Sequence, residues 1–195
     1  MQKLWTAAFL TSTLLVSPLS WAHESFMQGA HLGIQAGAQT NSFHGIEVLS
    51  TPIVGVHADY YWGFPEGVFA GLGAEYDAAL DRSSSSANFQ FFNLGTLGYK
   101  VRRSWTTAFT GYLGAERGAI ALNMNLAVIV THATADILLL NNTVEHDAIA
   151  GGIAPGVALN FKLTPDVTMG AHYRYEIFPY SVHGHNVILK VSYRL

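Results

Sequence analysis

The residues of this sequence that could do chemistry are charged side chains that recur at every second position of otherwise apolar segments. Glu75 and Asp77 follow this spacing in one segment, and Arg174 and Glu176 follow it in another. Alternate residues of a β-strand face the same side, so each pair is expected to share one face. Because an unpaired buried charge is costly, we expect these side chains to form ion pairs with one another.

The elements that must position these residues are strands, which are recognised by a period of two. Apolar residues alternate through 30–40, 53–63, 67–79, 105–117, 156–163, 166–177 and 186–195, and less cleanly through 88–101. No window shows sustained helical spacing. The sequence therefore predicts an all-β fold of eight antiparallel strands, and eight strands close a barrel whose interior is just filled by side chains.

The composition indicates that this barrel spans a membrane. Half of the 195 residues are apolar and 12% are charged, whereas soluble domains average about 25% charged residues. Beyond the N-terminus, no run of about 18 apolar residues is long enough for a membrane helix. A closed barrel is the other structure that satisfies its backbone in lipid. A soluble lipocalin-like barrel, apolar inside and polar outside, is the competing fold.

We expect the charges on the less apolar face of the strands to lie inside the barrel. The predicted lumen charge network consists of Glu75, Asp77, Glu116, Arg174, Glu176, Lys190 and Arg194, and His57, Asp59 and His172 share this inward parity. Two uses stay open: a plug of ion pairs that fills the lumen, or a narrow gated pore for small solutes in which Arg174 or Lys190 exchanges partners.

Residues 1–22 have the pattern of a secretory signal peptide, which would leave 23–195 as the barrel domain. Lys3 precedes the apolar stretch 4–16, and Ser20 and Ala22 are small residues at the expected cleavage site. The net charge of −3 with only ten Lys and Arg argues against a nucleic-acid partner. The absence of cysteine excludes a disulfide scaffold.

The predicted connections alternate in length, as they do in bacterial outer-membrane barrels, whose short turns face the periplasm. The short ones are 63–67, 102–104 and 164–166, and the long ones are 41–52, 80–88, 118–147 and 178–185. Aromatic residues are predicted to form girdles near the short turns (Tyr60, Tyr61, Trp62, Phe64, Tyr99 and Trp105) and near the long loops (Phe89, Phe91, Phe178 and Tyr180).

The segment 118–147 is too apolar for a solvent-exposed loop. Every second residue from 122 to 130 is apolar: Leu122, Met124, Leu126, Val128 and Val130. Three interpretations are open: a hairpin that protrudes beyond the membrane, a cap over the barrel mouth, or an additional transmembrane hairpin that gives ten strands. An exposed sheet edge can recruit a partner strand. We therefore expect 118–147 to be the main surface for contact with a host or surface partner.

Four stretches resemble the opacity-type, OmpA-like family of small outer-membrane barrels of Gram-negative bacteria. They are 29–37, 109–115, 157–167 and 172–175, followed by the terminal Val191-Ser192-Tyr193-Arg194-Leu195, which ends on Leu where the family's targeting strand usually has Phe. The resemblance implies an eight-stranded barrel in the cell outer membrane, with lipid and lipopolysaccharide around it and assembly through the C-terminal strand. It implies no catalytic residue and no cofactor.

Two other kinds of site are weighed and not expected. Lipid A deacylases resemble this barrel and use a His-x-Ser pair, but His172-Tyr173-Arg174 carries Arg where Ser is needed, and Ser181-Val182-His183 has the reverse order. His183-Gly184-His185 could clamp a transition metal, yet it is expected in an outer loop and no third ligand can be assigned. The sequence thus predicts a non-enzymatic barrel with a structural and adhesin-like surface role.

Overall fold

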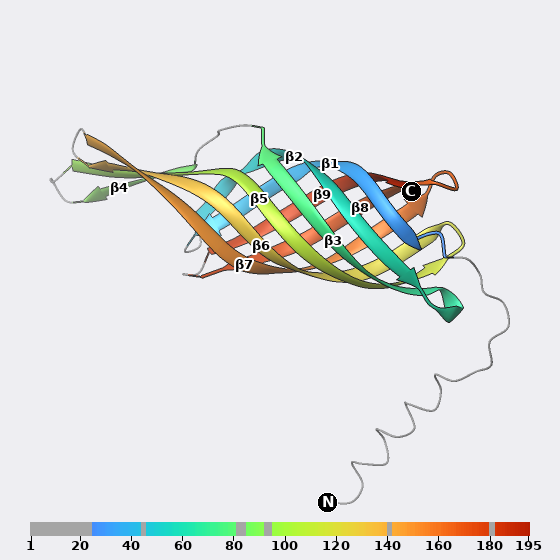
Figure 1. The fold of residues 1–195 in the computed structure, drawn as a ribbon. Coiled ribbons are helices and arrows are strands. Elements are labelled where there is room, and N and C mark those ends of the chain that lie inside the picture. The colour runs from blue at the N-terminus through green and yellow to red at the C-terminus, as the bar shows by residue number, and fades with distance from the viewer. Residues whose placement is uncertain (1–24, 44–45, 81–84, 92–94, 140–141, 180–181) are drawn as a thin grey trace, which may run out of the picture.

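The computed structural model describes residues 25–43, 46–80, 85–91, 95–139, 142–179 and 182–195, nearly all of them in strands (Figure 1). The predicted signal peptide lies outside these residues. The strands are β1 (Gly29–Phe43), β2 (Ile46–Gly63), β3 (Val68–Ala79), β4 (Ser85–Phe91), β5 (Gly95–Arg117), β6 (Ile120–Leu139), β7 (Asn142–Lys162), β8 (Val167–Phe178) and β9 (Val182–Arg194).

Eight of these strands close an antiparallel up-and-down barrel. The strand order is β3-β2-β1-β9-β8-β7-β6-β5, and β3 pairs with β5 from Val68↔Ala115 to Ala78↔Trp105 to complete the ring. The predicted eight-stranded barrel is confirmed, and the ten-stranded alternative is wrong for the described residues. The ninth strand, β4, pairs with β5 outside the ring.

The alternation of residues along each strand separates an apolar exterior from a mostly polar interior. In β6, Leu122, Met124 and Leu126 are each more than half exposed, whereas the alternating Asn123 and Asn125 are buried. This distribution is the reverse of a lipocalin-like barrel and excludes that alternative. No helix in the described part of the chain is long and apolar enough to cross a membrane.

The number of barrel strands was correctly predicted, but several assignments along the chain were wrong. Residues 88–101 are not one strand, because they are divided between β4 and β5, and the predicted turn 102–104 lies inside β5. The missing barrel strand is β6, which includes residues 120–130 of the predicted long loop. Gly118, with φ of 63°, allows the tight turn that joins β5 to β6.

β4 and the outer parts of β5, β6 and β7 continue beyond the barrel as a twisted sheet (Figure 1). We call residues 85–91, 95–103, 131–139 and 142–152 the protruding sheet. The outer half of the predicted loop 118–147 therefore forms a protruding hairpin, and the capping alternative is wrong for the described residues. The predicted long loops 41–52 and 178–185 are largely strand as well, because β1, β2 and β9 extend into them.

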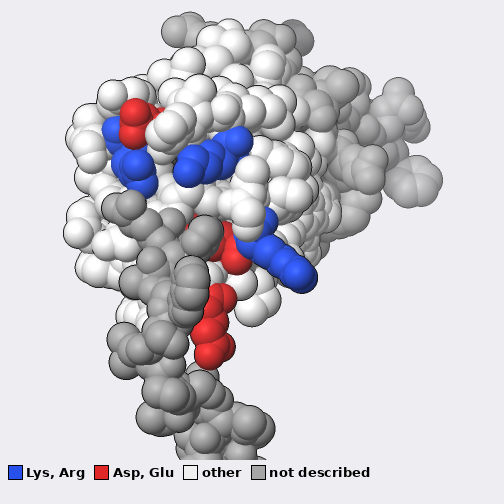
Figure 2. Space-filling model, turned by 90° about the vertical axis from the view of Figure 1, so that its right-hand side faces the viewer, with Lys and Arg blue, Asp and Glu red and all other residues white. Residues whose placement is uncertain are grey.

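The two ends of the barrel differ in their connections. At the turn end lie the termini of the barrel and the short connections 64–67, 118–119 and 163–166, including the 3-10 helix η2 (Pro65–Gly67). The opposite end, from which the protruding sheet extends, is the hairpin end. Figure 2 views the turn end and shows charged side chains of both signs around it.

Aromatic side chains lie on the exterior near both ends, but four predicted girdle positions are wrong. Tyr61 and Phe178 are buried inside the barrel, and Tyr99 and Trp105 do not lie near the turn end. Tyr60 and Trp62 are exposed near the turn end, with ring centres 5.0 Å apart. Trp105 was predicted at that end and instead lies toward the hairpin end, where it stacks between Tyr76 and His132. The error follows from the wrong turn at 102–104, which reversed the direction of the strand that contains Trp105.

The apolar exterior predicts a depth-dependent response to charge. Leu126→Arg places a cation midway along the apolar run of β6 and should reduce the free energy of unfolding in lipid vesicles by about 2–4 kcal/mol. Ile149→Arg, at a 70% exposed position of the protruding sheet, is the matched control and should cost about 0–1 kcal/mol. Urea titrations monitored by tryptophan fluorescence measure both values, and equal costs would contradict a membrane-facing belt.

Candidate functional site

The centre of the lumen holds a carboxylate between two cations. Glu75 of β3 lies 2.8 Å from Lys190 Nζ of β9 and 2.9 Å from Arg174 Nη1 of β8. All three side chains are at most 3% exposed. Because β3 is separated from β8 and β9 by other strands in the ring, these ion pairs cross the lumen from wall to wall. Alternation explains the geometry, since each residue occupies an inward position of its strand.

Neutral and acidic side chains complete this central cluster. Asp77 lies 3.5 Å from Arg174 Nη2 and accepts a 2.5 Å hydrogen bond from Gln35 Nε2. The hydroxyl of Tyr112 lies 3.1 Å from one oxygen of Asp59 and 3.1 Å from one oxygen of Glu75. The carboxylates therefore have several donors each, as buried charges require.

A second cluster fills the lumen nearer the hairpin end. Glu176 is fully buried and accepts hydrogen bonds from Arg103 at 2.8 Å and from Gln39 at 2.9 Å, with Asn186 Nδ2 at 3.5 Å. The guanidinium of Arg103 also lies 5.2 Å from the ring centre of Phe178. Arg103 reaches the lumen from the register shift in β5 between residues 103 and 105.

The N-terminal segment closes the lumen at the turn end. Ser25, Phe26 and Met27 are buried, and the two apolar side chains pack in a cluster that includes Tyr61 and Phe69. Glu116 holds this segment: its carboxylate accepts hydrogen bonds from Ser25 Oγ at 3.0 Å and from the backbone amides of Phe26 and Met27 at 3.2 and 3.3 Å. Residues 25–28 thus form a plug, which we call the N-terminal plug.

The structure divides the seven residues of the predicted lumen network among four places. Glu75, Asp77, Arg174 and Lys190 meet in the central cluster, and Glu176 belongs to the second cluster. Glu116 binds the N-terminal plug. Arg194 lies 3.5 Å from Asp166 at the turn end, where both side chains are partly exposed to solvent. The last pair lies at the rim of the barrel.

Sequence reasoning missed Arg103 and the uncharged partners of the network. Arg103 was assigned to a tight turn, although the carboxylate of Glu176 on the predicted inward face required a cation nearby. Gln35 and Tyr112 occupy inward positions of predicted strands and were passed over because neither is charged. The N-terminal plug has no strand pattern to reveal it. The signal for the uncharged partners is that each inward carboxylate needs hydrogen-bond donors at other inward positions.

Within the lumen, His57 Nε2 lies 2.8 Å from Ser192 Oγ and 3.8 Å from Asp59. Asp59 is 3.8 Å from the same nitrogen that faces Ser192, whereas a catalytic triad uses the two different ring nitrogens. This trio faces the lumen, whereas a lipid A deacylase is expected to carry its catalytic residues on the outer face. In the described residues, no group of three or more His, Cys, Asp or Glu could hold a metal ion.

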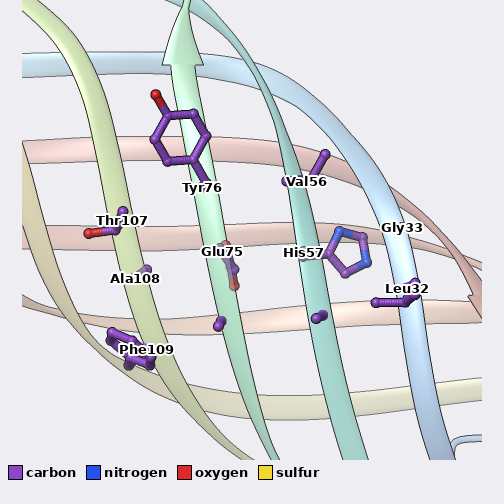
Figure 3. A pocket seen from close by; sticks show the side chains of 11 residues that line it. Leu32, Gly33, Val56, His57, Glu75, Tyr76, Thr107, Ala108 and Phe109 are labelled. Atoms are coloured by element: carbon purple, nitrogen blue, oxygen red, sulfur yellow. The ribbon is translucent and has the colours of Figure 1, made fainter.

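The barrel wall next to the central cluster carries a shallow hollow on its outer surface (Figure 3). Leu32, Val56, Tyr76 and Phe109 are its exposed large side chains. Its floor includes the small residues Gly33, Ala58 and Ala74. The hollow offers apolar surface and no convergent polar groups on its open side, so it fits contact with lipid chains better than polar ligand binding.

Removing the central carboxylate should destabilise the barrel strongly. Glu75→Gln removes the negative charge that pairs with Lys190 and with Arg174. The free energy of unfolding should fall by roughly 3–5 kcal/mol. Adding Lys190→Met should recover part of this loss, because the double variant no longer buries that cation. Asp166→Asn, which removes the exposed pair with Arg194, should cost less than about 1 kcal/mol. Additive effects of Glu75→Gln and Lys190→Met would show that the two residues are not coupled.

Loss of the Glu116 carboxylate should release the N-terminal plug. Glu116→Ala removes the acceptor of the Phe26 and Met27 amides, so their hydrogen exchange should accelerate by about 10-fold or more, since a hydrogen bond to a charged group contributes about 1.5–3 kcal/mol. Arg117→Ala, at the exposed neighbouring position, should leave the exchange unchanged. Exchange measured by mass spectrometry on peptides from this segment tests the plug. Unchanged protection in Glu116→Ala would contradict it.

No protein-family model matches the sequence, and no curated protein is similar to it in sequence. Among solved structures, Ail, the attachment invasion locus protein of Yersinia pestis, superposes with a TM-score of 0.56 at 15% identity, covering 86% of this chain and 99% of Ail. Ail in complex with the heparin analogue sucrose octasulfate gives a TM-score of 0.53 at 14% identity, covering 86% of this chain and all of that one.

Neisserial surface protein A gives a TM-score of 0.45 at 13% identity, covering 86% of this chain and 98% of the neisserial one. The identities with Ail are low, so the likeness establishes the architecture alone. It agrees with the closed ring of eight strands and with the resemblance drawn from the sequence. The chain therefore has the fold of the small, OmpA-like, eight-stranded barrels of bacterial outer membranes.

Proposed function

We propose that the chain is an outer-membrane barrel that is exported and presents the protruding sheet at the cell surface as a site of adhesion. The closed ring and its apolar exterior support the membrane location, because a spanning structure must satisfy every backbone group internally. The apolar exterior would then contact lipid and the acyl chains of lipopolysaccharide. The barrel-assembly machinery would recognise the C-terminal strand β9.

One observation carries the surface role: the protruding sheet has a strand edge without a neighbour. β7 pairs with β6 along its whole outer part, from Leu139↔Asn142 to Val130↔Gly151, but its pairing with β8 begins only at Ile153↔Ile177. In the described residues, the edge of 142–152 that faces away from β6 therefore has no strand partner. Such an edge can add a strand from another protein through backbone hydrogen bonds.

The orientation of the barrel supports presentation of this sheet outside the cell. The short connections and both barrel termini lie at the turn end, and short turns face the periplasm in bacterial barrels. The protruding sheet would then point outward. Ail, the attachment invasion locus protein, shares the fold, and its complex with a heparin analogue suggests sulfated glycans as one probe for this chain.

The two alternatives have less support. A pore would need a continuous lumen, whereas the central cluster, the second cluster and the N-terminal plug occupy it at three levels. A lipid-modifying enzyme would need a nucleophilic hydroxyl and a base at the outer surface. The Ser192–His57 hydrogen bond lies inside the lumen instead. We therefore propose a role without catalysis or a cofactor.

Adhesion by cells that display the full chain tests the proposal. Bacteria of a non-adherent strain that express it should bind to epithelial monolayers or heparin-coated plates. In the variant, residues 133–148 are replaced by Asn-Gly, a two-residue hairpin turn, which removes most of the free edge. We expect this variant to lose most of the binding.

The control replaces Gly118-Ala119 at the turn end by Asn-Gly and should bind as the wild type does. A mobility shift between boiled and unboiled samples verifies that each variant is a folded barrel. Undiminished binding by the shortened variant would overturn the proposed site. Wild-type binding no stronger than that of cells with an empty vector would overturn the adhesive role.

A further inference from the structure

Two histidines lie on the exterior of the barrel at the hairpin end, on a strand where the sequence predicted a loop. His183 and His185 belong to β9 and face outward, in the same row as the exposed Val187 and Leu189. Successive outward residues of a strand are about 6.7 Å apart along its axis. The two imidazoles therefore stand side by side at the boundary of the apolar belt, on a paired strand whose backbone fixes their spacing.

Two tyrosines of β8 flank these imidazoles. Tyr175 is directly opposite His185 in the β8–β9 register, and its ring centre lies 5.7 Å from that of His183 and 5.2 Å from that of His185. The hydroxyl of Tyr173 lies 2.7 Å from Nδ1 of His185. The rings are thus packed against neighbours, and their orientations are restricted before any ligand binds.

His185 makes a hydrogen bond of the kind that metal-binding histidines usually make. A metal-bound imidazole typically holds one nitrogen in a hydrogen bond, which directs the lone pair of the other nitrogen at the metal. In the tautomer of His185 that carries its proton on Nδ1, the Tyr173 hydroxyl accepts a hydrogen bond from Nδ1–H and leaves the lone pair of Nε2 free to bind a metal ion. For His183, Nδ1 is buried without a hydrogen-bond partner among the described residues, so Nε2 is the nitrogen that an ion could reach from outside.

We propose that His183 and His185 form a surface site for a borderline transition-metal ion, with Cu²⁺ preferred over Ni²⁺ and Zn²⁺. Imidazole nitrogen suits these ions, and their affinity order places Cu²⁺ highest. Since no third His, Cys, Asp or Glu gathers here among the described residues, water completes the coordination. Tyr173 is a positioning residue that holds the imidazole of His185.

The test uses the full chain, refolded in detergent micelles without a polyhistidine tag and titrated with CuCl₂. The wild type should bind one Cu²⁺ ion more tightly than it binds any further Cu²⁺ ion. The electron paramagnetic resonance spectrum of this first ion should show coupling to two imidazole nitrogens. His183→Asn with His185→Asn should abolish that signal. Each single substitution should lower the Cu²⁺ affinity by at least about 10-fold. Even the loss of a residue that only hydrogen-bonds to a metal ligand costs about 10-fold or more.

His132→Asn is the matched control, because His132 is also an exterior histidine at the hairpin end but stacks on Trp105 without a second histidine beside it in the described structure. It should leave affinity and spectrum unchanged. Tyr173→Phe should lower the affinity by roughly 10-fold while both nitrogens remain in the spectrum. Heat modifiability confirms that each variant is folded. Unchanged binding in the double variant, or no tight Cu²⁺ in the wild type, would overturn the site.

Discussion

The pairing of β3 with β5 is the constraint on which the rest of this molecule depends. A strand that crosses lipid cannot leave its amide and carbonyl groups without partners, so the sheet must close on itself. The eleven residue pairs from Val68↔Ala115 to Ala78↔Trp105 make that closure. β5 is longer than this seam, and its outer residues pair with β4 instead. One strand therefore ends the membrane barrel and begins the protruding sheet.

Closure also determines what the inward side chains can be. In a ring of eight strands the walls are close enough for Glu75 to reach Lys190 and Arg174 across the lumen. The crowding is severe at Gly73, where a Cβ atom would lie 1.9 Å from the Asp59 carboxylate. Small inward residues thus make room for large polar ones opposite them. Buried ion pairs are costly, and these hold the walls together because the Glu75 carboxylate accepts hydrogen bonds from Lys190, Arg174 and Tyr112 at once.

Much of this arrangement could be predicted from a period of two, and the failures have a physical pattern. Alternation identified β1, β2, β3, β8 and the barrel part of β9, because one face meets lipid and the other meets the lumen. It failed at Arg103, where a register shift in β5 interrupts the parity and a basic pair with Ser104 looks like a turn. The alternation at 120–130 was seen but assigned to a loop, because the Gly118-Ala119 turn was not recognised.

The site was less predictable than the strands. Parity placed Glu75, Asp77, Arg174 and Lys190 on inward faces, but it cannot say which side chains meet across a lumen. That depends on the stagger of the strands. Glu116 has the same parity and binds the N-terminal plug instead, since the buried backbone amides of Phe26 and Met27 lie within its reach. His183 and His185 were expected in a loop because pairing of the strands beyond the membrane leaves little hydrophobic signal.

The continuity of β5, β6 and β7 from the membrane into the protruding sheet has a mechanical consequence. No hinge separates the two parts within these three strands, so a pull on the sheet would travel along unbroken backbones into the barrel wall. Force directed along paired strands loads their hydrogen bonds together in shear, whereas a sideways pull would open them one at a time. A cell tethered through this sheet would be held by the barrel in its membrane. The force needed to detach it would depend on the angle between the pull and the strands.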